Sequence, residues 1–449
     1  MPSARGDRHG LLTRPVAEVM RRMTGPMVAG IVAILFFNLV DTWWIAQMGT
    51  HELAAVSMTF PVSFVITSLA MGLGVGLSAS LGRSLGQGNH EAAGRFATHG
   101  VLLAVLLVSL LSATGLMWLT PLFRAMGADD TLLALIRAYM VPWFLGVPLL
   151  VVPLVGNSAL RATGDTRTPG IIMALAGLAN GVLDPLLMFG IGPFPELGIQ
   201  GAAIASILSW LLALIAGVRQ LHRRDLLRRP QPGPEMLSQW RRILAIGMPA
   251  AVANLLAPLT NAIIIALLAR TGVEAVAAWG ASNRVEALLL IGSMAVSSVL
   301  PPITAQNMGA GQPERVHEAL SLALRGLLIW QALLYILLWL AAPWVAHFFS
   351  DDPGVSELIV RYLRWIGWSW GLLACVYQAG AIFNGLGEGL KAMGLQTARL
   401  VVLALPLVSA GIWFAGVNGA FAGMAAANTL AGLFTLFWVR PRLLSAIYR

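Results

Sequence analysis

The chain has 449 residues, of which 57% are hydrophobic and only 11% are Asp, Glu, Lys or Arg. Soluble chains contain about 25% charged residues, so this composition excludes a soluble enzyme and predicts a protein that crosses a membrane many times. The net charge of +9 does not predict a nucleic-acid partner, because most arginines lie in short segments between apolar runs.

The expected fold class is an all-α membrane protein, because apolar runs long enough to cross a bilayer as helices recur along the whole sequence. Six runs cover 16–46, 53–80, 93–120, 131–158, 168–190 and 198–218, and six more cover 243–268, 276–303, 318–346, 356–384, 392–414 and 417–439. Twelve transmembrane helices in two six-helix lobes are therefore expected. The domains are an N-terminus (1–15), an N-lobe (16–218), a linker (219–242), a C-lobe (243–439) and a tail (440–449).

Arginine is distributed unevenly among the segments that connect the runs. It is frequent at the two ends of the chain and in alternate connections, for example at Arg5, Arg8, Arg83, Arg95, Arg223, Arg224 and Arg449. Positively charged connections stay on the cytoplasmic side of a membrane. The N-terminus, the linker and the tail are therefore expected in the cytoplasm.

The two halves of the sequence resemble each other at a constant separation. Four pairs of residues are each 223 positions apart: Pro26 and Pro249, Gly49 and Gly272, Gly88 and Gly311, and Gly164 and Gly387. A shared separation at several landmarks indicates internal duplication. With six helices in each half, both repeats enter from the same side, so they are expected to be parallel and related by a pseudo-twofold axis. That arrangement predicts a substrate site between the lobes and alternating access to it.

One acidic residue, Asp41, interrupts the apolar run at 26–46. A carboxylate at this depth costs about 2.5–3.5 kcal/mol on insertion scales and usually faces a cavity or the bundle interior. We therefore expect Asp41 to respond to the coupling ion. The alternative is a structural aspartate that is satisfied by Asn38 or Thr42.

A second acid, Asp184, lies in the fifth run, and neither acid is repeated in the second half. The offset places Ile264 opposite Asp41, and the string VLALPL around Pro406 contains no acid. Residues that occur in both halves are explained by the fold that the halves share. Buried acids that occur in only one half are better explained by a chemical function.

Asp41 and Asp184 each lie some six residues from the outer end of a helix, about 9 Å at helical rise, and so at matching depth. Asn180 shares a helix face with Asp184, and Ser206 reaches a similar depth. The carboxyl, amide and hydroxyl oxygen atoms of these residues predict a binding site for a proton. If the ion is sodium, Asp41, Asn180 and Asp184 are the expected ligands. Close carboxylates repel each other when both are ionised, which favours retention of a proton. The alternative is that Asp184 caps a helix before a kink at Pro185.

Five residues are weaker candidates for the lining of a substrate cavity: Phe37, Asn38, Arg284, Met294 and Tyr377. Aromatic and methionine side chains suit flat lipophilic cations, although they serve packing more often. Arg284 lies two residues before Glu286 and so points another way. It either offsets an acid across the central cleft or pairs with the neighbours of Glu286.

No motif of an enzyme is present in the sequence. The glycine-rich string GLGVGLSASLG lies inside an apolar run, where small residues serve helix packing, and no strand precedes it. The single Cys375 excludes internal disulfides and thiolate metal clusters, and the histidines form no group. A transporter without a cofactor is therefore expected, with the lipid bilayer and small lipophilic cations as partners, and it is expected to act as a monomer.

Several of these features together resemble the multidrug and toxic compound extrusion (MATE) family. They are Pro26 with Asp41 in the first run, GTHELAAVS after it, LGQGNHEAA, RATGDTRTP after the fourth run, NGVLDP in the fifth and the twofold repeat. The resemblance covers nearly the whole chain. It is closer to the DinF-like branch, in which the first helix carries the coupling acid, than to the NorM branch, whose acids in the seventh and tenth helices are missing here.

The resemblance implies antiport, in which cationic or amphipathic compounds are exported in exchange for protons or sodium ions. It implies that Asp41 is the coupling acid and that Asn180 and Asp184 belong to the polar network around it. Pro26 would be the position at which the first helix bends. Ser206 would be the hydroxyl of the sixth helix. Two alternatives stay open: a flippase of lipid-linked oligosaccharides from the same superfamily, and an intramembrane enzyme that acts on lipids.

Overall fold

The computed structural model describes residues 10–448, which are almost entirely helical. Arg5, Arg8, Arg449 and most of the expected N-terminal segment therefore lie outside the described residues. The first half contains α1 (Val16–Met48), α2 (Thr50–Gly86), α3 (His90–Met117), α4 (Leu119–Ala125), α5 (Asp130–Ala162), α6 (Arg167–Met188) and α7 (Ile199–Arg223).

The second half is more often interrupted. It contains α8 (Pro234–Leu268), α9 (Val273–Leu289), α10 (Ile291–Gly309), α11 (Pro313–Phe349), α12 (Pro353–Ile366), α13 (Trp370–Leu386), α14 (Gly389–Thr397), α15 (Leu405–Phe434) and α16 (Arg440–Ile447). A 3-10 turn, η1 (Gly367–Ser369), joins α12 to α13, and π-helical segments η2 (Ala398–Ala404) and η3 (Thr435–Val439) flank α15. Helices are expected here, because a lipid-exposed backbone must satisfy its polar groups within the segment.

The helices account for twelve membrane spans. Ten helical runs of the described chain are long and apolar enough to cross a membrane, and α9 with α10, bent by 49°, forms an eleventh. The last run, Gly389–Ile447, has 59 residues, or about 89 Å at helical rise, which far exceeds the ~30 Å of a hydrocarbon core. Its backbone leaves helical geometry at Ala415 and Gly416, so it divides into two spans.

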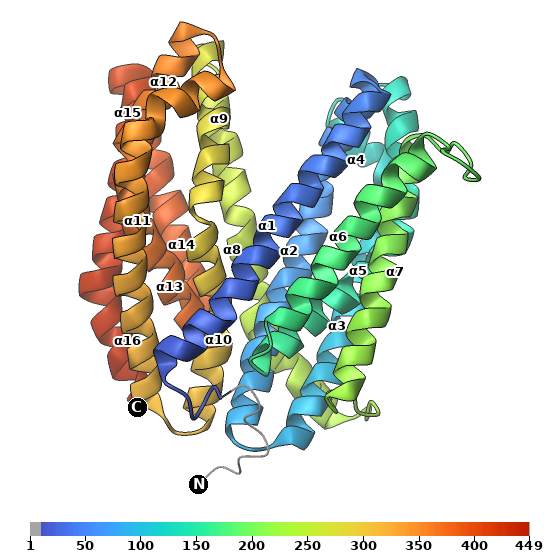
Figure 1. Ribbon diagram of the computed structural model, residues 1–449, viewed down its shortest axis with the longest axis vertical. Helices are drawn as coiled ribbons and strands as arrows, with labels where there is room; N and C mark the ends of the chain where they lie inside the picture. Colours follow the sequence, from blue (N-terminus) through green and yellow to red (C-terminus); the bar gives the residue numbers. More distant parts are fainter. Residues whose placement is uncertain (1–9, 449) are drawn as a thin grey trace.

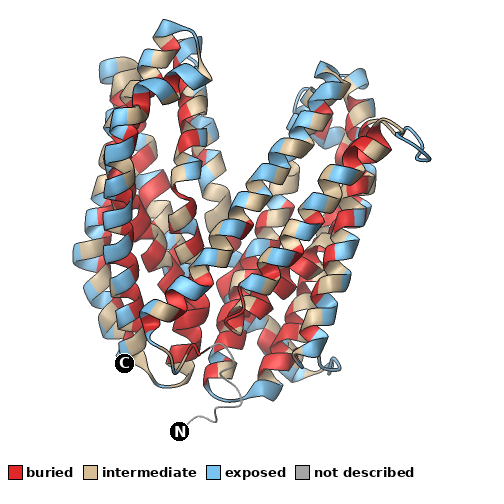
Figure 2. Ribbon diagram, viewed as in Figure 1, coloured by how far each residue is buried: buried red, intermediate tan, exposed pale blue. Residues whose placement is uncertain are grey.

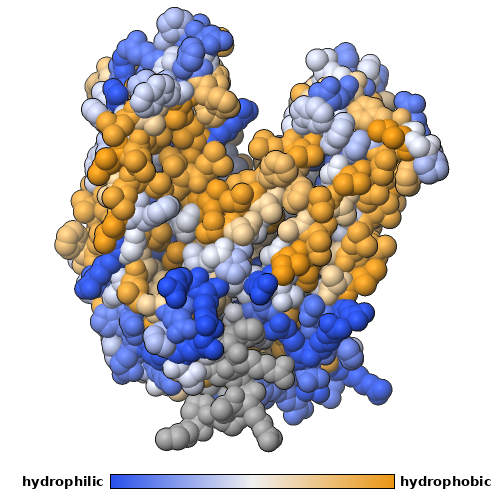
Figure 3. Space-filling model, viewed as in Figure 1, coloured by the Kyte–Doolittle hydropathy of each residue, from blue (hydrophilic) through white to orange (hydrophobic). Residues whose placement is uncertain are grey.

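The two halves form two lobes that meet at one end of the molecule and diverge toward the other (Figure 1). Both described ends of the chain lie at the closed end. The space-filling view shows a hollow between the lobes, a hydrophobic band over their flanks and hydrophilic residues at both ends (Figure 3). This is the expected arrangement of a multi-span protein with a central cleft.

Glycines let the two lobes approach closely at the closed end, where α2 packs against α8 and α10. A Cβ atom at Gly72 would collide with the backbone of Gly247 and Ala251, and one at Gly86 would collide with the backbone of Gln306. Gln306 also donates from Nε2 to the carbonyl oxygen of Ala162 at 2.5 Å across the two lobes. Backbone contact on this scale is possible only between small residues.

Buried residues fill the interior of both lobes (Figure 2). One apolar cluster occupies the N-terminal half, including Leu77 and Phe144, and another joins α8, α9, α12 and α15 around Trp279 and Tyr362. A third cluster, beside the closed end, combines α10, α11 and α13 with Val19 and other residues at the start of α1. The sequence placed residues 16–218 in one lobe, whereas the start of α1 packs against the other.

Gly72→Leu should lower the thermal unfolding temperature of the detergent-solubilised protein, because the larger side chain has no room between α2 and α8. Overpacking of this kind costs about 1–3 kcal/mol. Gly280→Ala is the control, since an added methyl group at Gly280 in α9 meets nothing within 4 Å. Equal unfolding temperatures for Gly72→Leu and the unchanged protein would contradict the packing described for the closed end.

Candidate coupling site

The structure brings together the two acids that break the repeat. Asp41 lies one to two turns before the end of α1, and Asp184 lies near the end of α6. Their carboxyl groups are within hydrogen-bonding reach of each other. Asp184 is completely buried and lies inside α6 rather than at its start, so it is not a helix cap.

Two further polar side chains extend the pair along α6 and α7. Asn180 donates from Nδ2 to Oδ1 of Asp184 at 3.0 Å, as expected for residues one turn apart. The same amide donates to Oγ of Ser206 at 3.4 Å. Thr42, by contrast, donates its hydroxyl to the backbone oxygen of Asn38 at 2.8 Å. We call Asp41, Asn180, Asp184 and Ser206 the N-lobe polar cluster.

The sequence analysis missed Tyr139 of α5. Its side chain is 8% exposed and lies near enough to Asp41 and Asp184 for their charges to act on its hydroxyl group. Tyr139 and Tyr362 are 223 residues apart, as are Asn38 and Asn261. The repeat alone did not mark this tyrosine as part of an ion site, because folding explains residues that occur at the same place in both halves.

A cavity of about 130 Å³ lies beside the N-lobe polar cluster, between α1, α5, α6 and α7. Phe37, Asn38, Asn180 and Trp210 are among its lining residues. The ring of Phe37 covers Gly177, where a Cβ atom would collide with it. The structure therefore joins Phe37 and Asn38 to the polar cluster, and small residues on α6 provide the space.

The remaining candidates lie in the C-lobe, apart from this cavity. Tyr362 donates to Oε2 of Glu286 at 2.7 Å and to Oδ1 of Asn283 at 3.3 Å. Arg284 is exposed and makes no hydrogen bond or ion pair with the described residues, so it neither pairs beside Glu286 nor touches an acid across the cleft.

Met294 and Tyr377 do not line the N-lobe cavity. Met294 is 50% exposed on α10. Tyr377 of α13 is half-buried, and the guanidinium of Arg399 lies 5.7 Å from its ring centroid. Arg399 is itself buried and donates to Oδ1 of Asn428 at 3.1 Å. Tyr377 therefore takes part in a cation–π contact within the C-lobe.

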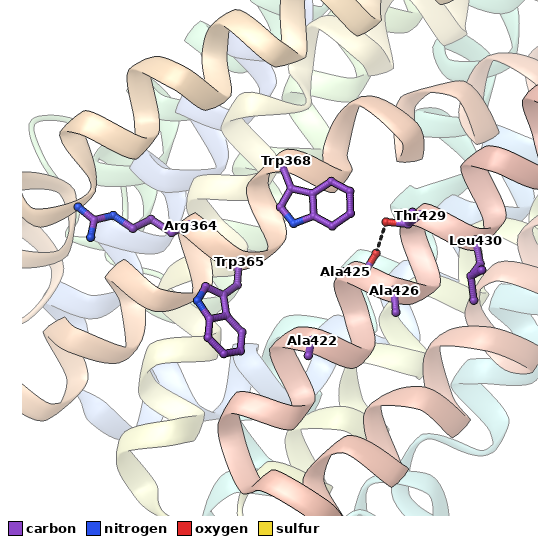
Figure 4. A pocket seen from close by; sticks show the side chains of 8 residues that line it. All are labelled: Arg364, Trp365, Trp368, Ala422, Ala425, Ala426, Thr429 and Leu430. Atoms are coloured by element: carbon purple, nitrogen blue, oxygen red, sulfur yellow. Dashed lines mark hydrogen bonds between the residues drawn. The ribbon is translucent and has the colours of Figure 1, made fainter.

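A larger groove of about 550 Å³ lies in the C-lobe between α12 and α15. Its walls are the indoles of Trp365 and Trp368 on one side and small residues such as Ala422 and Ala426 on the other (Figure 4). The guanidinium of Arg364 points away from it and lies over the ring of Trp339 at 4.6 Å. The groove is apolar and is separate from the N-lobe polar cluster.

The described residues contain no group of three or more His, Cys, Asp and Glu side chains that could hold a metal ion. The N-lobe polar cluster offers two carboxylates, an amide and a hydroxyl. Oxygen donors of this kind suit a proton or a hard cation rather than a transition metal.

Two six-span parallel repeats around a central cleft, with a close pair of acids in one lobe, are the architecture of a class of membrane transporters. The family model MatE matches residues 26–186 and again 249–409. The chain therefore belongs to the MATE family of transporters, and it is not an enzyme. Both matches begin at a proline of the repeat, Pro26 and Pro249, which confirms the duplication.

Relatives of known name agree with this family. The chain is 45% identical to the "FAD transporter" of Shewanella oneidensis over 429 residues, which is 95% of either chain. It is 25% identical to the "Probable multidrug resistance protein NorM" of Thermotoga maritima, over 94% of this chain and 92% of the relative. The crystal structure of the Vibrio cholerae MATE transporter VcmN in the bent form superposes with a TM-score of 0.91 at 27% identity, over 96% of this chain and 98% of that one.

Asn180→Ala should slow coupled transport by about 10- to 150-fold, because a hydrogen bond to a charged group contributes about 1.5–3 kcal/mol. The measurement is the initial rate of ion-driven efflux from proteoliposomes at matched protein density. Asn254→Ala is the control, since Asn254 of α8 is half-buried and has no partner among the described residues. Equal rates for both variants would show that Asn180 does not support the acids.

Proposed function

We propose that the protein is a secondary active exporter that exchanges its cargo for protons, and that Asp41 and Asp184 bind the coupling proton. The observation that carries the proposal is the close pair of acids in one lobe. Oδ2 of Asp184 is buried and has no hydrogen-bond partner among the described residues. Ionised carboxylates only accept hydrogen bonds, so a proton on Asp41 supplies the donor that Asp184 lacks.

Sodium is the second candidate for the coupling ion. The oxygen atoms of Asp41, Asn180, Asp184 and Ser206 form the kind of donor set that hard cations prefer. A proton and a sodium ion would both neutralise the repulsion between two carboxylates in an apolar setting. The two ions are distinguished by the gradient that drives transport.

The open cleft supports alternating access. If the arginine-rich connections and both termini are cytoplasmic, the closed end faces the cytoplasm and the cleft opens outward. A proton from outside then neutralises the acids, cargo leaves, and the lobes rock so that the cytoplasmic end opens and releases the proton. The cytoplasmic membrane of a bacterium is the expected location, and the monomer is the expected working unit.

Flavin adenine dinucleotide is the first candidate cargo, because the relative with 45% identity is named for its transport. This dinucleotide carries two phosphates and two flat ring systems. Arg284 is about eleven residues, or ~16 Å, inside the outer end of α9, near the middle of a membrane. An arginine at this depth faces a water-filled cavity rather than lipid, so its free guanidinium is available for a phosphate group.

The burial pattern of α9 supports this orientation of Arg284. Trp279, Ser282 and Val285 are buried in the C-lobe, whereas Ala277 and Arg284 are exposed on another side of the helix. In Figure 1, α9 lies on the side of the C-lobe toward α1. An anionic group can therefore contact Arg284 while aromatic rings occupy the cleft.

Lipophilic cations are the second candidate cargo. The cavity beside Phe37 and Asn38 is small, aromatic on one side and close to two acids, which favours positively charged compounds. More distant relatives, such as the Thermotoga maritima protein, are named for multidrug resistance, which supports a cargo other than a single metabolite. The positive charge of Arg284 repels a cationic cargo, whereas it attracts the phosphate groups of the dinucleotide.

Asp41→Asn should abolish ion-driven transport and leave the thermal unfolding temperature nearly unchanged, because the amide keeps the volume but cannot exchange a proton. The measurement is efflux of a dye cation and of flavin adenine dinucleotide from proteoliposomes, with a pH gradient and a sodium gradient imposed in turn. Asp351→Asn, at an exposed site, is the control. Coupled transport at the unchanged rate in Asp41→Asn would refute the proposed role.

Arg284→Gln should reduce transport of the dinucleotide by about tenfold or more, because a charge-assisted hydrogen bond to phosphate is lost. Transport of a dye cation should be unchanged or faster. Arg325→Gln in α11 is the matched control, since Arg325 is also exposed and has no partner among the described residues. Equal loss for both cargoes would contradict recognition of the anion by Arg284.

A further inference from the structure

The segment that joins the two lobes is strongly basic. Residues 222–242 contain six arginines and only two acids, Asp225 and Glu235. Arg224 forms an ion pair with Asp165, a buried acid of the N-lobe. The other five arginines are exposed and form no ion pair with any residue that the structure describes. We call them the linker arginines: Arg223, Arg228, Arg229, Arg241 and Arg242. Most of the positive charge of the segment is therefore uncompensated within the described part of the protein.

Although polar loops of this kind are commonly mobile, the first part of the segment is fixed to α3. Asp225 has a φ of 56°, a left-handed conformation that aspartate tolerates, and it turns the chain directly after α7. Leu226 is 4% exposed within the N-lobe cluster. The N–H of Arg228 donates to Oγ1 of Thr98 at 2.9 Å, and the hydroxyl of Thr98 lies 3.1 Å from the oxygens of Arg228 and Gly94, to which it donates. Thr98 therefore binds the main chain of Arg228.

A second fixed point follows at His99, which is completely buried. The N–H of Gln231 donates to Nε2 of His99 at 3.3 Å. The proton of the imidazole is therefore on Nδ1, which donates to Oε1 of Gln239 in α8 at 2.9 Å. The stem of Arg228 also crosses Gly94, where a Cβ atom would collide with its Cγ. Residues 225–231 thus lie in one position on α3 and present their arginine side chains from a fixed backbone.

The linker arginines lie at the level of the lipid headgroups. α7 has 25 residues, about 37 Å at helical rise, whereas the hydrocarbon core is about 30 Å thick. The last turns of α7, with Arg223, therefore extend into the headgroup layer, and the fixed segment continues from there. α8 has 35 residues, so its first turns, with Arg241 and Arg242, also lie outside the hydrocarbon core. In Figure 3, hydrophilic residues cover the closed end on the side of the N-lobe, where α7 ends in Figure 1.

The side of the membrane on which these arginines lie and their fixed position have different explanations. The positive-inside rule accounts for arginines on one side of a membrane in any loop, ordered or not. It does not account for the hydrogen bonds with Thr98 and His99 that hold the loop against the protein. A fixed set of cations binds an anionic surface with less loss of conformational freedom than a mobile set does. Clusters of about four to eight basic residues next to a membrane-spanning helix are typical of sites for anionic phospholipids.

We infer that the linker arginines are a docking surface for anionic phospholipids of the leaflet at the closed end. Thr98 and His99 are its positioning residues, because they fix the backbone on which it is built. The guanidinium groups of Arg228 and Arg229 then meet the phosphate groups of the lipids, and the three other linker arginines add charge on either side. This surface depends neither on the cargo nor on the coupling ion, so it stands or falls separately from the proposed function.

Lipid binding to the detergent-solubilised full chain tests this surface, with bound lipids counted by native mass spectrometry. Phosphatidylglycerol should bind more tightly than phosphatidylcholine. The double variant Arg228→Gln/Arg229→Gln should bind phosphatidylglycerol at least about tenfold more weakly, since each arginine near an anionic surface contributes about fivefold. Its binding of phosphatidylcholine should be unchanged. The control is Arg21→Gln/Arg83→Gln, which removes two exposed arginines of other segments at the same end and should change neither affinity.

Two results would overturn the inference. One is equal binding of the two lipids to the unchanged protein. The other is equal weakening by the two double variants, which would show an effect of net charge alone. Glycerophosphoglycerol, the soluble headgroup, should compete only weakly with the lipid. Competition at the concentrations at which the lipid itself binds would mean a site for a soluble phosphate in place of a membrane surface.

Thr98→Val separates the fixed position from the charge, because it removes the hydroxyl and keeps every arginine. The amides of residues 228–231 should exchange hydrogen about threefold faster or more, and phosphatidylglycerol should bind at least about twofold more weakly. Thr114→Val is the matched control, since the hydroxyl of Thr114 in α3 donates to Leu110 O at 2.9 Å within its own helix. Unchanged exchange in Thr98→Val, or faster exchange with unchanged lipid binding, would overturn the role of Thr98 in positioning the surface.

Discussion

A pair of carboxyl groups in an apolar lobe is the constraint on which the rest of the structure depends. Asp41 and Asp184 repel each other when both are ionised, and the surrounding helices exclude most of the water that would weaken the repulsion. Apart from a proton on Asp41, the only direct donor to Asp184 among the described residues is the amide of Asn180. The site is therefore unstable without a bound cation, and that instability makes it responsive to an ion.

The fold connects this local instability to a large movement. Asp41 lies on a helix whose two ends are packed in different lobes, with Pro26 between them. The lobes touch at one end through backbone-to-backbone contacts at glycines such as Gly72 and Gly247, so few side chains interdigitate there. A contact of this kind can separate as a unit, so the lobes can rock while each keeps its core.

Much of the fold could be predicted from the sequence, because membrane spans follow from apolar length and the duplication follows from the constant separation of prolines and glycines. The polar cluster was also predictable, since Asp41 and Asp184 break the repeat at equal depth. Tyr139 was missed because a tyrosine in an apolar run resembles packing until its position beside both acids is known. The packing of the start of α1 against the C-lobe depends on long-range contacts of residues such as Val19, which no local pattern contains.

The measurement that tests the central claim most directly is proton release from the purified protein on addition of cargo in weakly buffered solution. The account predicts that cargo displaces protons from the unchanged protein and displaces none from Asp41→Asn, although both bind the cargo. Release of sodium in place of protons would mean that Asp41 and Asp184 still form the coupling site, with sodium as the coupling ion. Cargo binding that releases neither ion from the unchanged protein would contradict the claim that Asp41 and Asp184 couple an ion to export.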